Sequence, residues 1–292
     1  MKRRALFGLV LLASFVGVRA QSLETAPIPV FVSILPEKYF VERVGGERVD
    51  VSVLVAPGQS PHTYEPTPRQ MSRLAGARLY FRIGMPFEDA WMERLAEANP
   101  RMEIVDLREG IRLRPIDALD GAGKHDHAGL PDPHVWTDPR LVKIMAAHIR
   151  DVLSAVDPTH REEYRSRYDA FARDLEALDA DIRLRLKDLE GQKFMVFHPS
   201  WGYFADAYDL QQVPIESEGK EPGPRSLARV IDLGRKQGIH VIFVQKQFSQ
   251  RYAETVAGAI GARVVKVDPL AEDYLDNMRH VAMAFAEALR GS

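Results

Sequence analysis

Three histidines lie in separate segments of the chain, and each is the direct neighbour of a proline. They are His62 in Pro61-His62-Thr63, His134 in Pro133-His134-Val135 and His198 in Phe197-His198-Pro199. A fourth segment, Val267-Asp268-Pro269, places a carboxylate in the same kind of setting. Three imidazoles and one carboxylate are a complete ligand set for a divalent transition metal. If these four side chains converge, both halves of the chain contribute ligands to one metal ion.

Three of the four side chains follow short apolar runs that have the pattern of buried strands. These are His62 after residues 49–55, His198 after residues 193–197 and Asp268 after residues 263–267. In open α/β sheets, ligands bind beyond the carboxyl ends of the parallel strands. The sequence therefore predicts where these three side chains lie, whereas no clear strand precedes His134.

Strand-like and helix-like patterns alternate along both halves of the chain. In the first half the apolar runs are residues 30–35, 49–55, 79–83 and 102–105, with helical patterns at 68–77 and 88–98. In the second half they are residues 193–197, 213–216, 240–244 and 263–267, with helical patterns at 226–237 and 249–260. This alternation predicts an α/β fold of two lobes, each with a parallel-type sheet flanked by helices.

One long helical pattern lies between the two halves. Asp157 is a favourable N-cap, Pro158 a favourable first residue and Gly191 a favourable stop. Apolar residues recur every three or four positions between them. A helix over residues 158–190 would be about 50 Å long, which exceeds the width of one lobe. We predict a rigid linker helix at 158–190, joining an N-terminal lobe at 27–157 to a C-terminal lobe at 191–292.

The first twenty residues have the pattern of a secretory signal peptide. Three basic residues, Lys2, Arg3 and Arg4, precede an apolar run that ends at the small residue Ala20. The alternative is a membrane anchor, but the run is short for a bilayer span. We expect export to a bacterial periplasm and removal of residues 1–20.

The composition argues against a nucleic-acid partner and against a metal site with cysteine ligands. Removing the four basic residues of the leader leaves 35 basic against 41 acidic residues without a basic run, so we expect no nucleic-acid partner. The chain has no cysteine, so a metal site must use nitrogen and oxygen ligands. For the same reason we expect no lipid anchor, and we expect a monomer.

The remaining histidines have different surroundings. His148, His160, His240 and His280 lie in helical patterns or at a strand start, where structural or solvated roles are expected. The glycine-rich segment 121–129 contains His125-Asp126-His127, which is either an auxiliary metal-recruiting loop or a plain solvent loop.

Five segments together resemble the metal-binding receptors of bacterial zinc and manganese ABC transporters. In chain order they are residues 58–68 (GQSPHTYEPTP), 133–139 (PHVWTDP), 197–204 (FHPSWGYF), 218–222 (EGKEP) and 267–270 (VDPL). The resemblance implies two α/β lobes joined by a long helix, with a metal between them. It assigns His62 and His134 to the first lobe and His198 and Asp268 to the second. It also implies delivery of the metal to an inner-membrane ABC permease.

The third ligand position favours zinc. Manganese-selective members of the family tend to carry glutamate there, whereas this chain has His198, and three imidazoles suit zinc better than manganese. Zinc members often carry a long histidine-rich loop, which is reduced here to three residues. We expect Zn²⁺, with Mn²⁺ as the alternative. Glu65 and Asp138 are candidates for carboxylates that orient the ligands.

A zinc hydrolase is the alternative function, because three histidines with an open water position are also a catalytic pattern. The sequence contains no His-Glu-x-x-His, and a fourth ligand at Asp268 would close the water position. We therefore expect a binding protein rather than an enzyme. Because the ligands bind metal only when deprotonated, metal binding should weaken as pH falls through the histidine range.

Overall fold

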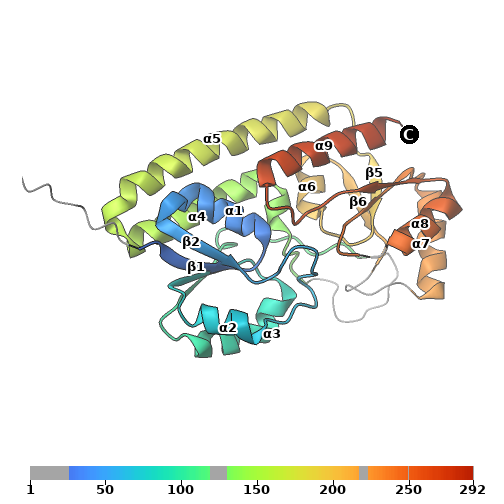
Figure 1. Ribbon diagram of the computed structural model, residues 1–292. Helices are drawn as coiled ribbons and strands as arrows, with labels where there is room; N and C mark the ends of the chain where they lie inside the picture. The colour runs from blue at the N-terminus through green and yellow to red at the C-terminus, as the bar shows by residue number, and fades with distance from the viewer. Residues whose placement is uncertain (1–25, 119–129, 217–222, 249, 292) are drawn as a thin grey trace, which may run out of the picture.

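The computed structural model describes residues 26–118, 130–216, 223–248 and 250–291, so the predicted leader at 1–20 lies outside the described residues. Two four-stranded parallel sheets lie side by side, and a long helix runs along both of them (Figure 1). The predicted α/β fold of two lobes is confirmed. Among the described helices, none is both long and apolar enough to cross a membrane.

The first sheet has the strand order β2-β1-β3-β4. Its strands are β1 (Ile28–Val32), β2 (Val49–Val53), β3 (Leu79–Arg82) and β4 (Glu103–Asp106). Its helices are α1 (Leu35–Gly45), α2 (Pro68–Leu74) and α3 (Pro86–Ala98), and α2 and α3 lie together below the sheet in Figure 1. Both of these lower helices begin at a proline, whose fixed φ suits the first turn and whose missing N–H has no intrahelical acceptor there.

The second sheet repeats this arrangement with the order β6-β5-β7-β8. Its strands are β5 (Lys193–Val196), β6 (Gln211–Pro214), β7 (Val241–Val244) and β8 (Arg263–Lys266). Its helices are α6 (Gly202–Ala207), α7 (Pro224–Lys236) and α8 (Gln250–Ile260). The eight strands of the described residues occur where the sequence predicts them, and no end differs by more than three residues.

The helices that connect the lobes are α4 (Pro139–Val156), α5 (Arg161–Arg185) and α9 (Tyr274–Arg290). The α5 helix is shorter than the predicted 158–190. Residues Pro158–His160 form a 3₁₀ turn, and at the other end the helix stops at Arg185, before Asp188 adopts a φ of 69°. The predicted lobe boundaries at 157/158 and 190/191 stay a prediction. The C-terminal helix α9 lies beside α5 (Figure 1).

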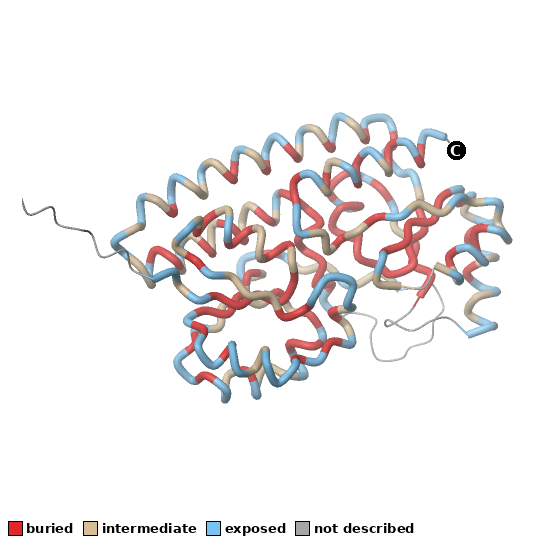
Figure 2. Tube along the Cα trace, viewed as in Figure 1, coloured by how far each residue is buried: buried red, intermediate tan, exposed pale blue. Residues whose placement is uncertain are grey.

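The buried residues of the second sheet face two different cores. Along β5, Phe194 and Val196 belong to a large core that also contains residues of the first sheet, whereas Met195 belongs to a smaller core under α7 and α8. This alternation follows from the two-residue period of a strand. One continuous core therefore extends through both lobes, and the buried residues of α5 lie on the side of the helix that faces it (Figure 2).

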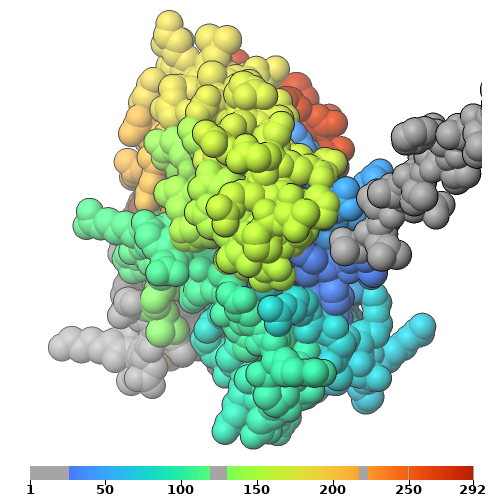
Figure 3. Space-filling model, turned by 90° about the vertical axis from the view of Figure 1, so that its left-hand side faces the viewer, coloured from blue at the N-terminus to red at the C-terminus, as the bar shows by residue number. Residues whose placement is uncertain are grey.

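The helices α4 and α5 pack against each other at one end of the molecule. In Figure 3 the yellow-green residues of this region lie above the teal residues of the first lobe. On the inner side, Tyr274 of α9 packs edge-on against Phe40 of α1, with ring centroids 4.9 Å apart. The C-terminal helix therefore contacts the first lobe directly.

We predict that α9 is held by its aromatic contacts. Phe285 is fully buried and stacks on Phe243, with ring centroids 3.9 Å apart. Phe285→Ala should lower the free energy of unfolding by about 3–5 kcal/mol, because it leaves a cavity in the large core. The control is Met283→Ala in the same helix, where the side chain is exposed and the change should stay within about 0.5 kcal/mol. Urea unfolding followed by circular dichroism measures both, and equal losses would contradict this packing.

Candidate metal centre

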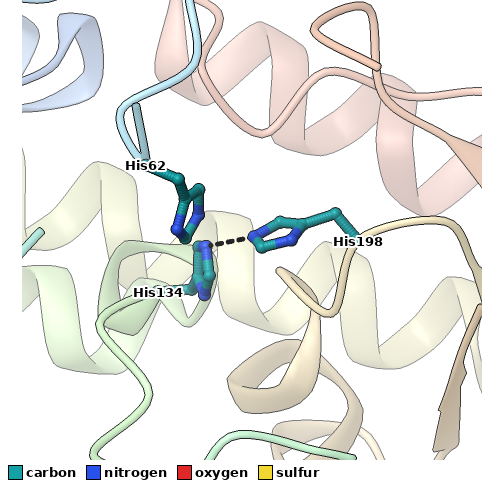
Figure 4. A group of neighbouring side chains, drawn as sticks. All are labelled: His62, His134 and His198. Atoms are coloured by element: carbon teal, nitrogen blue, oxygen red, sulfur yellow. Dashed lines mark hydrogen bonds between the residues drawn. The ribbon is translucent and has the colours of Figure 1, made fainter. Parts of the chain in front are cut away.

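The structure brings His62, His134 and His198 together. His62 lies in the loop after β2, His134 directly precedes the 3₁₀ turn Val135–Thr137, and His198 follows β5. Their rings point toward one another from three separate segments (Figure 4). Each ring offers one nitrogen, and the three nitrogens lie within 4.8 Å of one another. Around a tetrahedral zinc ion with Zn–N bonds of 2.0–2.1 Å, such nitrogens would be about 3.3 Å apart.

Two buried carboxyl groups fix the orientation of two of these rings. The Nδ1 atom of His134 is 2.7 Å from Oδ1 of Asp132, and the Nδ1 atom of His198 is 2.6 Å from Oε1 of Glu216. A carboxylate accepts hydrogen bonds, so each Nδ1 donates and each Nε2 is left with its lone pair. Carboxylate–histidine pairs of this kind orient metal ligands and raise their basicity.

The two fixed rings meet at their free nitrogen atoms. The Nε2 atoms of His134 and His198 are 3.2 Å apart, and the dashed line in Figure 4 joins them. With both Nδ1 atoms protonated, this contact brings two lone pairs together, which is unfavourable unless a proton or a metal ion lies between them. The arrangement is therefore suited to binding a cation.

Burial favours the neutral form of two of the imidazoles, those of His62 and His198. His134 and His198 are 2% and 4% exposed. Burial lowers the pKa of His198 well below the ordinary 6.5, and the neighbouring His134 lowers it further. Burial also lowers the pKa of His62 well below 6.5, and both other imidazoles add to this effect. Neutral imidazole is the form that binds a metal.

The His134 segment is bonded to the second lobe on both sides. Tyr203 in α6 donates to the backbone oxygen of Asp132 (2.9 Å), and Trp136 Nε1 donates to the backbone oxygen of Pro269 (2.7 Å). The side chain of Asp132 also pairs with Arg114 at 3.1 Å. Although burial acts to raise the pKa of Asp132, His134 and Arg114 together lower it, so this group stays ionised. His134 is therefore held at the junction of the lobes.

The His198 segment is held by a buried glutamine. Gln245, directly after β7, accepts from the backbone N–H of His198 at 3.3 Å and donates to its backbone oxygen at 2.6 Å. The same amide nitrogen donates to Ser200 Oγ at 2.8 Å. Phe248 stacks on the His198 ring, with centroids 4.9 Å apart. Gln245 therefore positions the loop that carries His198.

A small cavity adjoins the three rings and is lined by residues of both lobes. Its volume is about 20 Å³, which is enough for one ion or one water molecule. Its apolar walls include Met85, Trp136, Phe248 and Leu270, and its polar walls include Gln245 and Gln247. Apolar walls exclude bulk water, which strengthens the interaction of a metal ion with its ligands.

The Asp268 carboxylate, the fourth predicted ligand, is not part of the three-histidine group. Its Oδ1 atom accepts from the backbone N–H of Leu270 at 2.9 Å and from Gln247 Nε2 at 3.2 Å. Its Oδ2 atom lies 3.3 Å from Lys246 Nζ. Asp268 lines a neighbouring groove, whereas the cavity beside the histidines is lined by the two residues that follow it, Pro269 and Leu270.

The other predicted site residues lie apart from the rings or outside the described residues. Glu65 is exposed, and Asp138 caps α4 through the backbone N–H of Arg140. His125, Asp126 and His127 fall outside the described residues.

Sequence reasoning missed Asp132 and Glu216. Asp132 has a local signal in Asp132-Pro133-His134, because its Oδ1 also accepts the backbone N–H of His134 at 3.0 Å in a tight turn. Glu216 follows β6, the strand beside β5, so finding it requires knowledge of the strand order.

We predict that Asp132 supports metal binding. Asp132→Asn removes the ionised acceptor of His134 Nδ1 and should weaken zinc binding by about 10- to 100-fold. The matched control is Glu65→Gln, which also removes one carboxylate near a ligand in sequence and should leave the affinity unchanged. Competition with a chromophoric chelator measures both affinities. Equal affinities for the two variants would contradict the role of Asp132.

The chain is similar to known metal-binding proteins over most of its length. The family described as "Zinc-uptake complex component A periplasmic" matches residues 30–288. A crystal structure of ZnuA is 40% identical over 90% of this chain and 99% of that chain, with a TM-score of 0.83. A ZnuA deletion mutant with zinc bound is 41% identical over 90% and 98% of the two chains, with a TM-score of 0.81. The manganese-binding lipoprotein MntA of Halalkalibacterium halodurans is 28% identical over 85% of this chain and 84% of its own length.

The family match covers nearly all of the described residues, and it includes all three histidines of the site. The sequence predicted an α/β fold and a metal-binding protein rather than a hydrolase, and the family match confirms these predictions. The chain belongs to the family of periplasmic zinc-uptake components, which are metal-binding receptors of ABC transporters and not enzymes.

Proposed function

We propose that this chain captures Zn²⁺ in the periplasm through His62, His134 and His198 and delivers it to an ABC permease in the inner membrane. The observation that carries this proposal is the meeting of three imidazoles, two of them with their Nε2 lone pairs 3.2 Å apart. A set of imidazole nitrogen donors beside a largely apolar cavity favours zinc over metals that prefer oxygen.

The similarity to a zinc-bound ZnuA supports zinc, whereas the similarity to a manganese-binding lipoprotein keeps manganese as the alternative ion. The two ions differ in donor preference. Manganese favours carboxylate, carbonyl and water ligands, so a site dominated by three imidazoles would bind it more weakly than zinc.

The proposal also covers the export, the lipid attachment and the oligomeric state of the protein. We propose that residues 1–20 are cleaved on export, that the mature chain carries no lipid, and that it acts as a monomer between the extracytoplasmic space and the permease. The absence of cysteine from the sequence supports the second of these points, because no thiol is present to accept a lipid. Intact-mass measurement of the protein purified from the periplasm tests the cleavage and the lipid together.

The shared site predicts a specific response to losing one ligand. In structural zinc sites with four ligands, binding is worth about 10–16 kcal/mol, or roughly 2.5–4 kcal/mol for each ligand, so His198→Ala should weaken binding by about 100-fold or more. The control is His280→Ala, an exposed histidine in α9, which should bind zinc like the unchanged protein. Isothermal titration with a competing chelator gives affinity and stoichiometry. A His198→Ala protein with unaltered values would rule out the proposed site.

The lowered pKa values predict the pH range over which zinc binds. Because the pKa values of His62 and His198 lie well below 6.5, both rings are already neutral at pH 6.5, and protons compete with the metal only at lower pH. Zinc affinity should therefore be nearly constant from about pH 8 to about pH 6.5 and fall below that. Chelator competition across this range measures it, and a steady loss of affinity between pH 8 and 6.5 would contradict the burial argument.

A further inference from the structure

An arginine outside the metal centre connects the supports of two ligands. Arg114 is largely buried, with 18% of its side chain exposed, and it contacts three carboxylates. Its Nη1 atom lies 3.1 Å from Oδ2 of Asp132, its Nη2 atom 3.0 Å from Oδ1 of Asp117, and its Nε atom 2.9 Å from Oδ2 of Asp206. Arginine suits this position because its N–H donors form a rigid planar fork that can bond several acceptors at once.

The first branch of this network leads to His134. Asp132 accepts from Arg114 with Oδ2 and from Nδ1 of His134 with Oδ1, so one carboxylate joins the arginine to the ligand. The side chain of Asp132 is fully buried, so bulk water does not replace a partner that is lost. The guanidinium therefore limits the positions that this carboxylate can take, and with them the orientation of the imidazole ring.

The second branch leads to the loop that follows His198. Asp117 also accepts from Nε2 of Gln212 at 2.8 Å, through Oδ2. Gln212 lies in β6, and its Oε1 atom accepts the backbone N–H of Trp201 at 2.8 Å. Trp201 is the third residue after His198, in the loop between β5 and α6. Arg114 is therefore connected by hydrogen bonds to the supports of ligands from both halves of the chain.

The packing around Arg114 keeps it at the junction of the lobes. Its backbone oxygen accepts from the backbone N–H of Asp132 at 2.8 Å, and its own N–H donates to Tyr203 Oη at 3.1 Å. Tyr203 belongs to α6, the helix directly after the His198 loop. At the start of this helix, a Cβ atom at Gly202 would overlap Arg114 Nη1 and lie 2.9 Å from Oδ2 of Asp132. A glycine at this position therefore lets α6 approach the Arg114–Asp132 pair closely.

We propose that Arg114 is a positioning residue for metal binding, which sets the spacing of His134 and His198 by joining their supports across the two lobes. This inference rests on the proposed function and deepens it. Among the described residues, Arg114 is not one of those that line the metal cavity. It acts through Asp132 on one ring and through the second branch on the loop of the other. Its loss would loosen the 3.2 Å approach of the two Nε2 atoms that a metal ion has to bridge.

The test measures Zn²⁺ affinity by chelator competition in two variants of Arg114. Arg114→Met should weaken binding by about 3- to 10-fold, less than Asp132→Asn, because it acts one bond further from the ring. Arg114→Lys keeps the positive charge but not the fork, so it should also weaken binding. The matched control is Arg108→Met, which should leave the affinity unchanged. Arg108 is 17% exposed and pairs with Asp106 instead of with a support of a ligand.

Two further measurements separate positioning from a general loss of stability. The loss of affinity caused by Arg114→Met should be smaller in Asp132→Asn protein and in Gln212→Leu protein, because each background has already broken one branch. The control background is Gln211→Leu at the exposed start of β6, where the full loss should remain. The visible absorption of the Co²⁺-loaded protein reports the ligand geometry, and its bands should shift in Arg114→Met but not in Arg108→Met.

Full zinc affinity in Arg114→Met would overturn the proposal, and so would full affinity in Arg114→Lys, since charge alone would then suffice. It is also overturned if the losses add fully in both backgrounds or if the Co²⁺ bands stay unchanged. Thermal unfolding of each metal-free variant shows that it is folded, and if Arg114→Met is not, Arg114→Lys replaces it in every comparison. Failure of the proposed function has a different signature, because His198→Ala would then bind zinc normally.

Discussion

Two imidazole nitrogens held 3.2 Å apart with their lone pairs facing each other are the constraint on which the metal site depends. Left to themselves, neutral rings would turn away from this contact. They are prevented from doing so because Asp132 and Glu216 hold their other nitrogens at 2.7 and 2.6 Å. The protein thus maintains an unfavourable contact that a metal ion relieves, and the orientation of the ligands is largely set before the metal arrives. His62 completes the set from a loop, where its backbone N–H is held by Ser60.

The two-lobed scaffold positions the segments that carry the histidines. Parallel sheets bring the ends of β2 and β5 toward the same junction, and Glu216 reaches His198 because β6 pairs with β5. The His134 segment has no such strand, and instead it is bonded to the second lobe through Tyr203 and Pro269. A single core passes through both lobes, and the aromatic contacts of α9 tie its start to the first lobe. These connections favour small adjustments at the site over a wide hinge motion.

Local patterns predicted much of this structure from the sequence. Alternating apolar runs located all eight strands, and proline-adjacent histidines located the three imidazoles. The remainder depends on relations between distant segments. Glu216 could not be assigned without the strand order, and the contacts of Asp268 with Gln247 and Lys246 could not be predicted from its Asp-Pro pattern. In the structure its oxygen atoms bond to its own turn, to Gln247 and to Lys246. The predicted linker was too long because a regular apolar spacing continues past Arg185, where the backbone leaves the helix.

The central claim is that three imidazoles of one chain hold one metal ion. X-ray absorption at the zinc K-edge of the protein loaded with one equivalent of zinc tests this most directly, because imidazole rings give a distinct scattering pattern. We expect three imidazoles at about 2.0–2.1 Å and one oxygen donor in a four-coordinate shell. A shell with one imidazole or none, made mainly of oxygen, would contradict it.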